Sequence, residues 1–175
     1  MRFDDAALTL STRRLSLEPI RPEDADDLVA VLDDDALHEF IGGHPATLAE
    51  LRERWRRWSA RRSPDGRELW LNWVLRSREE NRPMGTLQAT VLVDQAAVAW
   101  VVGRAWQGRG YATEAARALV DWLVDGLQVR DVVAYIHPEH QASARVAANA
   151  GLVATDETVD GELVWRLRAH GPRTK

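Results

Sequence analysis

The residues best suited to chemistry lie at positions 107–112, where Gly108 and Gly110 stand between an apolar run and a helical pattern. Two glycines let the backbone turn tightly and bring several N–H groups together at the start of a helix. Such a loop binds phosphate, because the N–H groups and the positive end of the helix dipole face the anion. The loop lacks the Gly-Lys-Ser/Thr of a nucleoside-triphosphate site, and no acid follows at the spacing of a dinucleotide-binding fold. Two glycines by themselves are equally typical of a plain turn between a strand and a helix.

The composition excludes several other chemistries. The 175 residues contain no cysteine, so disulfides, thiolate nucleophiles and cysteine-ligated metals are excluded. The histidines show none of the short-range pairs that ligate a metal on a helix or finger. They are His38, His44, His137, His140 and His170. We therefore expect no metal site.

The charge is mildly acidic overall and unevenly spread. A formal net charge of -4 repels phosphate, so we expect no stable binding of nucleic acid. Residues 22–35 carry seven carboxylates and no basic side chain, whereas residues 47–62 carry six arginines against two glutamates. The arginine-rich segment has two interpretations, a surface that docks RNA or the ribosome and a solvated helix face.

The length and patterning indicate one domain. No repeat, low-complexity tract or linker divides the chain, so a single domain is expected over residues 1–175, with residues 171–175 as a loose tail. No stretch approaches the roughly 20 consecutive apolar residues of a membrane span. The first ten residues lack the apolar run of a signal peptide. A cytoplasmic protein is expected.

Hydrophobic periodicity predicts a mixed α/β chain around the glycine loop. Thr47 and Glu50 form a capping-box pattern that begins one of the helices. The run at residues 97–102 is apolar on both faces, which predicts a central strand that ends directly before the loop. Helices are also expected at residues 22–32, 112–123 and 141–150, and strands at residues 15–17, 69–75, 84–93, 132–136, 152–155 and 163–167.

Several of these segments resemble one family. Residues 107–112 read Gln-Gly-Arg-Gly-Tyr-Ala, which matches the Gln/Arg-x-x-Gly-x-Gly/Ala signature of the GNAT superfamily of acyl-CoA-dependent N-acetyltransferases. The segments at 12–17, 22–25, 110–115, 137–139 and 142–152 are similar to the bacterial branch named for the ribosomal-protein acetyltransferases RimJ and RimL. The resemblance implies an α/β (α+β) GNAT fold: a central mixed, mostly antiparallel sheet with a splayed parallel pair of strands, flanked by about four helices.

The resemblance also implies a coenzyme site for acetyl-CoA, with no metal. Backbone groups of Val101 and Val102 would pair with the pantetheine arm and polarise the thioester carbonyl. The pyrophosphate would lie on Gln107, Gly108, Arg109, Gly110, Tyr111, Ala112 and Thr113. His140 stands where the family has asparagine; it either donates to the coenzyme or is an exposed residue at the start of a helix.

The proton donor for the leaving sulfur is less well defined. Ser143 matches the serine that lies near the sulfur in RimL-like enzymes, and its alternative role is a hydroxyl that caps a helix start. Many family members use a tyrosine, but the matching position here is Ala147. Ser143 or water must therefore serve as the general acid.

A general base is needed because only a neutral amine attacks a thioester. His38, Glu39 and Glu68 are candidates for this base, and the sequence does not choose among them. For His38 and Glu39 a solvated helix end is the alternative. The acceptor cleft is expected to involve the following residues of the central strands: Trp70, Asn72, Gln88 and Trp100.

The expected activity is that of an acyltransferase acting without an acyl-enzyme. The acceptor would be a primary amine, with a protein N-terminus and a small molecule such as an antibiotic or polyamine ranked equal. The alternative from another class is a non-catalytic acyl-CoA-binding regulatory module, which His140 and Ala147 favour. Besides the amine, a second copy of the chain in a homodimer is considered as a partner; no membrane is expected.

Overall fold

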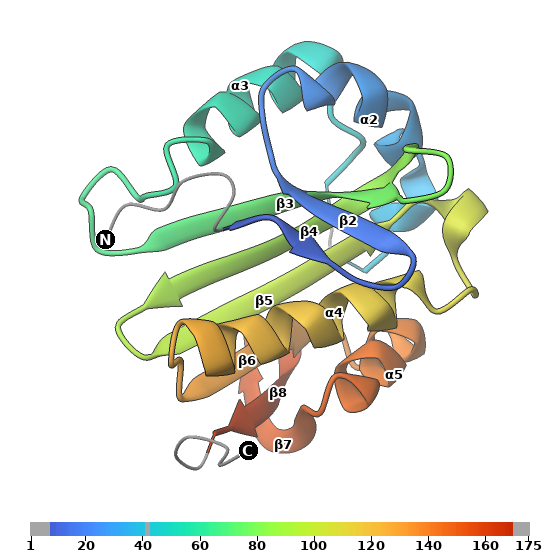
Figure 1. Ribbon diagram of the computed structural model, residues 1–175. Helices are drawn as coiled ribbons and strands as arrows, with labels where there is room; N and C mark the ends of the chain where they lie inside the picture. Colours follow the sequence, from blue (N-terminus) through green and yellow to red (C-terminus); the bar gives the residue numbers. More distant parts are fainter. Residues whose placement is uncertain (1–7, 41–42, 170–175) are drawn as a thin grey trace.

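Eight strands form one sheet in the computed structural model, which describes residues 8–40 and 43–169 (Figure 1). They are β1 (Leu10–Ser11), β2 (Leu15–Pro19), β3 (Leu69–Ser77), β4 (Pro83–Leu92), β5 (Gln95–Val102), β6 (Asp131–Ile136), β7 (Val153–Val159) and β8 (Glu162–Arg168). Their order across the sheet is β1-β2-β3-β4-β5-β6-β8-β7. All neighbours are antiparallel except β5 and β6, which run parallel. The mixed, mostly antiparallel sheet is confirmed.

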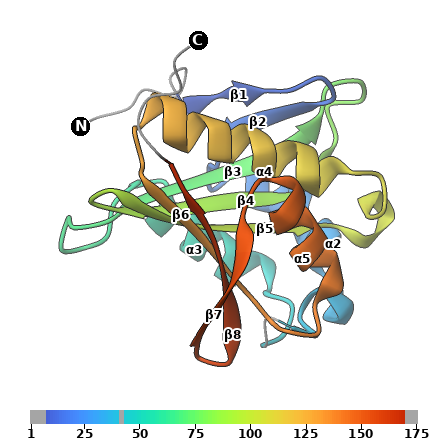
Figure 2. The same cartoon turned by 90° about the horizontal axis from the view of Figure 1, so that it is seen from below.

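Helices cover both faces of this sheet. Helices α2 (Asp24–Leu32) and α3 (Leu48–Trp58) pack on one face, whereas α4 (Tyr111–Asp121) lies on the other and contacts α5 (Gln141–Asn149) (Figure 2). The capping box at the start of α3 is present. The Thr47 hydroxyl accepts the Glu50 N–H, and the Glu50 carboxylate accepts the Thr47 N–H at 2.8 Å.

The ends of several elements differ from the sequence prediction. β1 was not predicted, because two residues are too short to show an alternating pattern. β7 extends to Val159, four residues past its predicted end, and six of its seven residues are exposed, so no buried face marks its length. The predicted tail at 171–175 lies outside the described residues.

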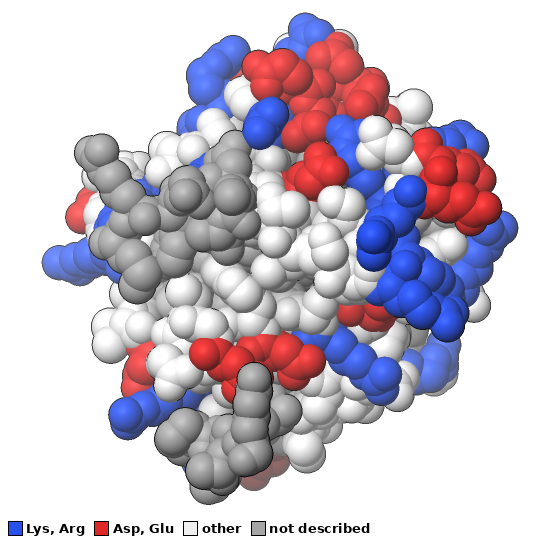
Figure 3. Space-filling model, in the orientation of Figure 1, with Lys and Arg blue, Asp and Glu red and all other residues white. Residues whose placement is uncertain are grey.

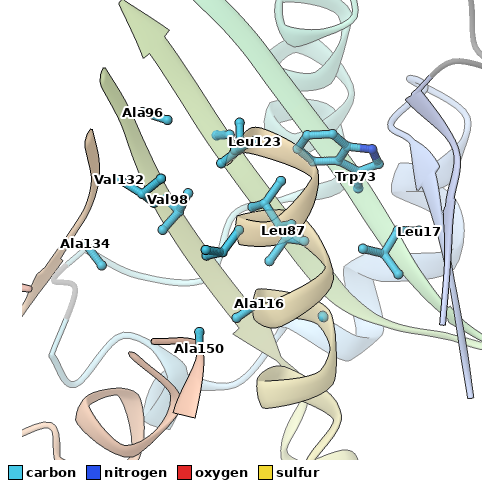
Figure 4. Close-up of a cluster of buried hydrophobic side chains, with 14 of the residues drawn as sticks. Leu17, Trp73, Leu87, Ala96, Val98, Ala116, Leu123, Val132, Ala134 and Ala150 are labelled. Atoms are coloured by element: carbon cyan, nitrogen blue, oxygen red, sulfur yellow. The ribbon is translucent and has the colours of Figure 1, made fainter. Parts of the chain in front are cut away.

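The main core fills the space between α4 and the sheet. Alternate residues of β4, among them Leu87, face α4, which contributes Ala116, and the turn after it, which contributes Leu123 (Figure 4). A smaller cluster on the opposite face joins Val74 of β3 to α2 and α3. Trp73, which the sequence did not single out, is completely buried in the main core.

The charged segments of α2 and α3 partly neutralise each other. Acidic side chains gather over α2, at the top of Figure 3. Arg76 of β3 reaches Asp24 at 2.8 Å and Asp27 at 3.4 Å, and Arg52 of α3 pairs with Asp26. Much of the acidic segment is therefore used to hold α2 against its neighbours. Within the described parts of the chain, no helix is both long and apolar enough to cross a membrane.

β5 is a central strand, as its apolar run predicts, but it is not buried along its whole length. It pairs with β6 only at Gln95↔Asp131, Ala96↔Val132 and Ala97↔Val133, after which the two strands diverge (Figure 2). Beyond that point Ala99 is exposed and Trp100 is half-buried, and no further residue of β5 pairs with β6. The divergence is the splayed parallel pair, and it leaves a gap in the sheet.

The buried indole of Trp73 provides a test of the core. Its Nε1 donates to the carbonyl of Leu8 at 2.7 Å, and its ring meets Trp122 edge-on at 5.8 Å. Trp73→Phe leaves that carbonyl without its donor, so we expect the free energy of unfolding to fall by about 1–3 kcal/mol in urea titrations followed by circular dichroism.

Trp70→Phe is the matched control. The Trp70 indole also donates a hydrogen bond, to Glu68 at 2.8 Å, but both partners are partly exposed and water can replace it. An equal loss in the two variants would show that the Leu8 contact does not stabilise the core.

Candidate active site

The gap between β5 and β6 opens into a cavity of about 870 Å³. One wall is the end of β5 with the glycine loop and the start of α4. The facing wall is the end of β6 with the start of α5 and the first residue of β8, and residues 34–40 between α2 and α3 close a further side. The cavity therefore lies where elements from both halves of the sheet meet.

The glycine loop presents backbone N–H groups to this cavity. Gly108 and Gly110 have φ values of +74° and +79°, a left-handed conformation that other residues adopt only with strain. Gly110 caps α4 but offers no side chain, and the first hydrogen bond of the helix runs from the Glu114 N–H to the Gly110 carbonyl at 3.0 Å. The N–H groups of residues 111–113 thus precede the helical ladder, at the positive end of its dipole. All three residues line the cavity.

Side chains hold the loop against its surroundings. The Gln107 amide donates to the carbonyl of Val102 at 2.9 Å, which ties the loop to the end of β5. Trp106 meets Tyr111 edge-on at 6.4 Å, and the guanidinium of Arg82 lies 5.6 Å from the Trp106 ring. Figure 3 shows basic side chains gathered at this edge of the molecule, where the β3–β4 hairpin and the glycine loop lie. The loop is therefore an ordered and locally positive structure.

Past Ala97, no strand of the described residues pairs with the edge of β5 that faces the gap. Val101 and Val102 lie on this edge and line the cavity, directly before the glycine loop. An extended ligand can pair with such an edge through main-chain hydrogen bonds. Coenzyme A has an extended arm joined to an anionic pyrophosphate, so the residues present fit the expected coenzyme.

The start of α5 brings Ser143 and His140 to the facing wall. The Ser143 hydroxyl is half-buried, lines the cavity and has no hydrogen-bond partner among the described residues, so it does not cap the helix there. His140 stacks on Phe40 with ring centroids 4.5 Å apart and an interplanar angle of 19°. Burial lowers the pKa of His140, and His137 lowers it further, while Glu39 opposes the shift. The lowered pKa favours the neutral imidazole.

Residues 34–40 reach the cavity because α2 ends close to β5. A Cβ on Gly103 would stand 2.5 Å from the Val31 side chain, so a glycine is needed where the end of α2 meets the end of β5. Phe40 then lies against His140 and, at 5.4 Å, against His137. This contact joins the segment between α2 and α3 to the facing wall.

Almost the whole expected coenzyme set meets at the cavity. Its lining includes Val101, Val102, Gln107, Gly108, Gly110, Tyr111, Ala112, Thr113, His140 and Ser143. Arg109 is the exception, because its guanidinium is directed toward the Trp106 ring, 6.0 Å away. Its backbone stays in the loop.

The expected base and acceptor residues are divided. Glu39 and Trp100 line the cavity, whereas His38 and Glu68 do not. Three more candidates lie outside the lining because their side chains project from the sheet face that α2 and α3 cover: Trp70, Asn72 and Gln88. Asn72 is buried there, and its Oδ1 has no hydrogen-bond partner within the described chain.

Other lining residues were not found from the sequence. Phe40, Glu162 and Arg145 come from three separate segments, and no local pattern connects them to the glycine loop. Asn149 could have been found, because it follows Ala142 by two helical turns and so shares its face of α5. Among the described residues, no group of three or more His, Asp or Glu side chains is placed to hold a metal ion.

Comparisons with known proteins agree with this geometry. The family model described as Acetyltransferase (GNAT) domain matches residues 14–153. No curated protein matches the chain in sequence. An acetyltransferase structure from Agrobacterium tumefaciens superimposes with a TM-score of 0.76 at 25% identity, covering 97% of this chain and 98% of that one.

Two further similar structures contain coenzyme A or its disulfide. RimJ of Mycobacterium smegmatis in complex with CoA-disulfide has a TM-score of 0.74 at 19% identity, over 92% of this chain and 87% of its own. The RimL ribosomal L7/L12 alpha-N-protein acetyltransferase in complex with coenzyme A has a TM-score of 0.76 at 16% identity. The match covers 91% of this chain and 97% of the RimL chain. At these identities the likeness concerns the fold. Because the family model spans most of the sequence, the chain belongs to the acetyltransferase (GNAT) domain family and is an N-acetyltransferase.

Proposed function

We propose that the protein transfers an acetyl group from acetyl-CoA directly to a primary amine. The observation that carries this proposal is the N-terminus of α4, which has no side-chain cap and opens into a cavity beside the unpaired edge of β5. An anion-binding helix start next to an edge that pairs with an extended arm suits coenzyme A better than a free phosphate. The absence of cysteine is consistent with transfer that forms no thioester on the enzyme.

Each part of the cavity has one task in this reaction. Acetyl-CoA supplies the activated thioester when it is bound. The N–H groups of residues 111–113 bind the pyrophosphate, and the β5 edge at Val101 and Val102 holds the arm and donates to the thioester carbonyl. Ser143 donates a proton to the departing sulfur. Of the three expected bases, only Glu39 lines the cavity. We therefore assign to Glu39 the role of the general base, which accepts a proton from the attacking amine.

The acceptor is proposed to be an amine that arrives as an ammonium ion. Carboxylates of Glu39, Glu139 and Glu162 line the cavity, and they attract a cation while the glycine loop attracts the anionic coenzyme. A protein N-terminal amine and a small-molecule amine both satisfy this requirement. The RimL structure is titled an alpha-N-protein acetyltransferase, which supports including N-terminal peptides among the acceptors tested.

Ser143→Ala tests the assignment of the general acid. We expect kcat to fall about 100-fold, as is typical when a proton donor is lost, while the Kd for coenzyme A is unchanged. Released coenzyme A is measured with a thiol reagent against a panel of amines and N-terminal peptides. The protein has no thiol of its own, so the signal comes from the product alone.

Ser59→Ala is the control, because Ser59 lies at the end of α3 and its hydroxyl donates to the Arg56 carbonyl. Full turnover by Ser143→Ala would show that water, and not Ser143, donates the proton to the leaving sulfur. Tight coenzyme binding with no turnover on any acceptor would instead indicate a non-catalytic acyl-CoA-binding module.

Gly108→Ala tests the anion-binding role of the loop. Its φ of +74° is nearly that of Gly66, at +73°, and an added Cβ would meet nothing within 4 Å at either position. Both alanine variants should therefore lose about 1 kcal/mol of stability through backbone strain. Only Gly108→Ala turns N–H groups away from the ligand, so we expect its Kd for coenzyme A, measured by calorimetry, to rise about tenfold. Equal Kd values in the two variants would show that the loop does not bind coenzyme A.

A further inference from the structure

Two motifs that are about 100 residues apart meet behind the glycine loop. The carboxylate of Glu114, in the first turn of α4, accepts the Thr12 hydroxyl at 2.6 Å and the backbone N–H of Arg14 at 2.9 Å. The Arg14 Nε donates to the same carboxylate at 2.6 Å. We call Thr12, Arg14 and Glu114 the clasp. It joins the turn between β1 and β2 to the helix that begins at the loop.

Arg14 also contacts the loop itself. Its Nη1 donates to the carbonyl of Arg109 at 3.0 Å, and its guanidinium lies 4.4 Å from the centre of the Tyr111 ring. Between these two contacts, a Cβ on Gly110 would stand 3.5 Å from the Arg14 Nη2. One planar guanidinium therefore contacts Arg109 and Tyr111, and lies beside Gly110, while it is held by Glu114.

The clasp does not belong to the ligand-binding surface. None of its three residues lines the cavity, whereas Gly110 and Tyr111, which Arg14 contacts, do. The guanidinium supports the loop from the side away from the ligand. Any effect of Arg14 on coenzyme binding must therefore pass through the backbone of residues 109–111.

We propose that the clasp holds this backbone in the conformation that binds the pyrophosphate of coenzyme A, which makes Arg14 and Glu114 positioning residues. The inference rests on the proposed function and adds residues to it. A loop with two glycines has many conformations, and ordering it during binding would reduce affinity. A loop that is already ordered by the clasp avoids this loss.

The clasp also reduces the repulsion expected between the Glu114 carboxylate and a pyrophosphate bound at the start of α4. A carboxylate in the first turn favours the helix dipole, but it would repel a pyrophosphate bound at the same end. Burial raises the pKa of Glu114, yet the hydrogen bonds from Thr12 and Arg14 lower it by more, so the carboxylate stays ionised. Arg14 neutralises that charge through its ion pair with Glu114. Neither side chain lines the cavity in which the ligand would bind.

The test compares Arg14→Ala, Arg14→Lys and Glu114→Gln with the control Arg78→Ala. Arg78 lies at the same edge and donates to the Thr12 carbonyl at 2.8 Å, but no contact joins it to the loop. We expect the Kd for coenzyme A and the KM for acetyl-CoA to rise about tenfold in the three clasp variants, with kcat at saturation within about twofold. Arg78→Ala should match the wild type.

Arg14→Lys separates positioning from charge. Lysine keeps the positive charge but cannot span Glu114 and the Arg109 carbonyl with one planar group. Wild-type affinity for coenzyme A in this variant would overturn the proposed role of the clasp. A lower kcat at unchanged KM would also overturn it. If Arg14 and Glu114 act as a unit, the double variant Arg14→Ala/Glu114→Gln loses no more affinity than the weaker-binding single variant.

Two further measurements keep the outcomes distinct. If Arg14→Ala does not fold, Thr12→Val, which removes only the hydroxyl, carries the test with an expected rise in Kd of about threefold. Unchanged affinity in Thr12→Val would then overturn the clasp. Wild-type protein that fails to bind coenzyme A refutes the proposed function, whereas wild-type binding equalled by every variant refutes the clasp alone.

Discussion

β5 and β6 pair at only three positions before they separate, and the rest of the site depends on this divergence. Parallel neighbours need a crossover connection, which α4 provides. The helix starts where β5 ends, so its N-terminus lies at the open end of the gap. α5 follows β6 directly, which brings Ser143 to the opposite wall. The backbone donors, the unpaired strand edge and the proposed acid thus come together as consequences of one topological feature.

Packing and binding are linked through α4. Its buried face inserts Ala115, Ala116 and Leu119 against the sheet, and the small alanines lie in the turns that follow the glycine loop. Short side chains there let the helix lie close to β5 and keep its N-terminus at the cavity. Arg14 and Glu114 fix the same end from the side, so the conformation that binds an anion is already stabilised in the folded chain.

Local patterns predicted every strand except β1, the helices and the glycine loop, because each is encoded within a few residues. They could not assign Trp70, Asn72 and Gln88 correctly to a wall of the cavity. Alternation shows which residues share a face of a strand, but not which face borders a gap that arises from a neighbouring strand. The contact of Arg14 with Glu114 likewise has no local signal, although both residues lie in segments that resemble the family.

In the proposed function, the construction of the cavity separates coenzyme binding from acceptor choice. The coenzyme wall depends mainly on backbone N–H groups and strand edges, which many different side chains can support. The carboxylates and Phe40 belong instead to residues 34–40, the turn between β6 and α5, and the start of β8. In the proposed function, substitutions in those segments change the acceptor without disturbing α4 or β5. This division is consistent with fold similarity over more than nine-tenths of the chain at 16–25% sequence identity.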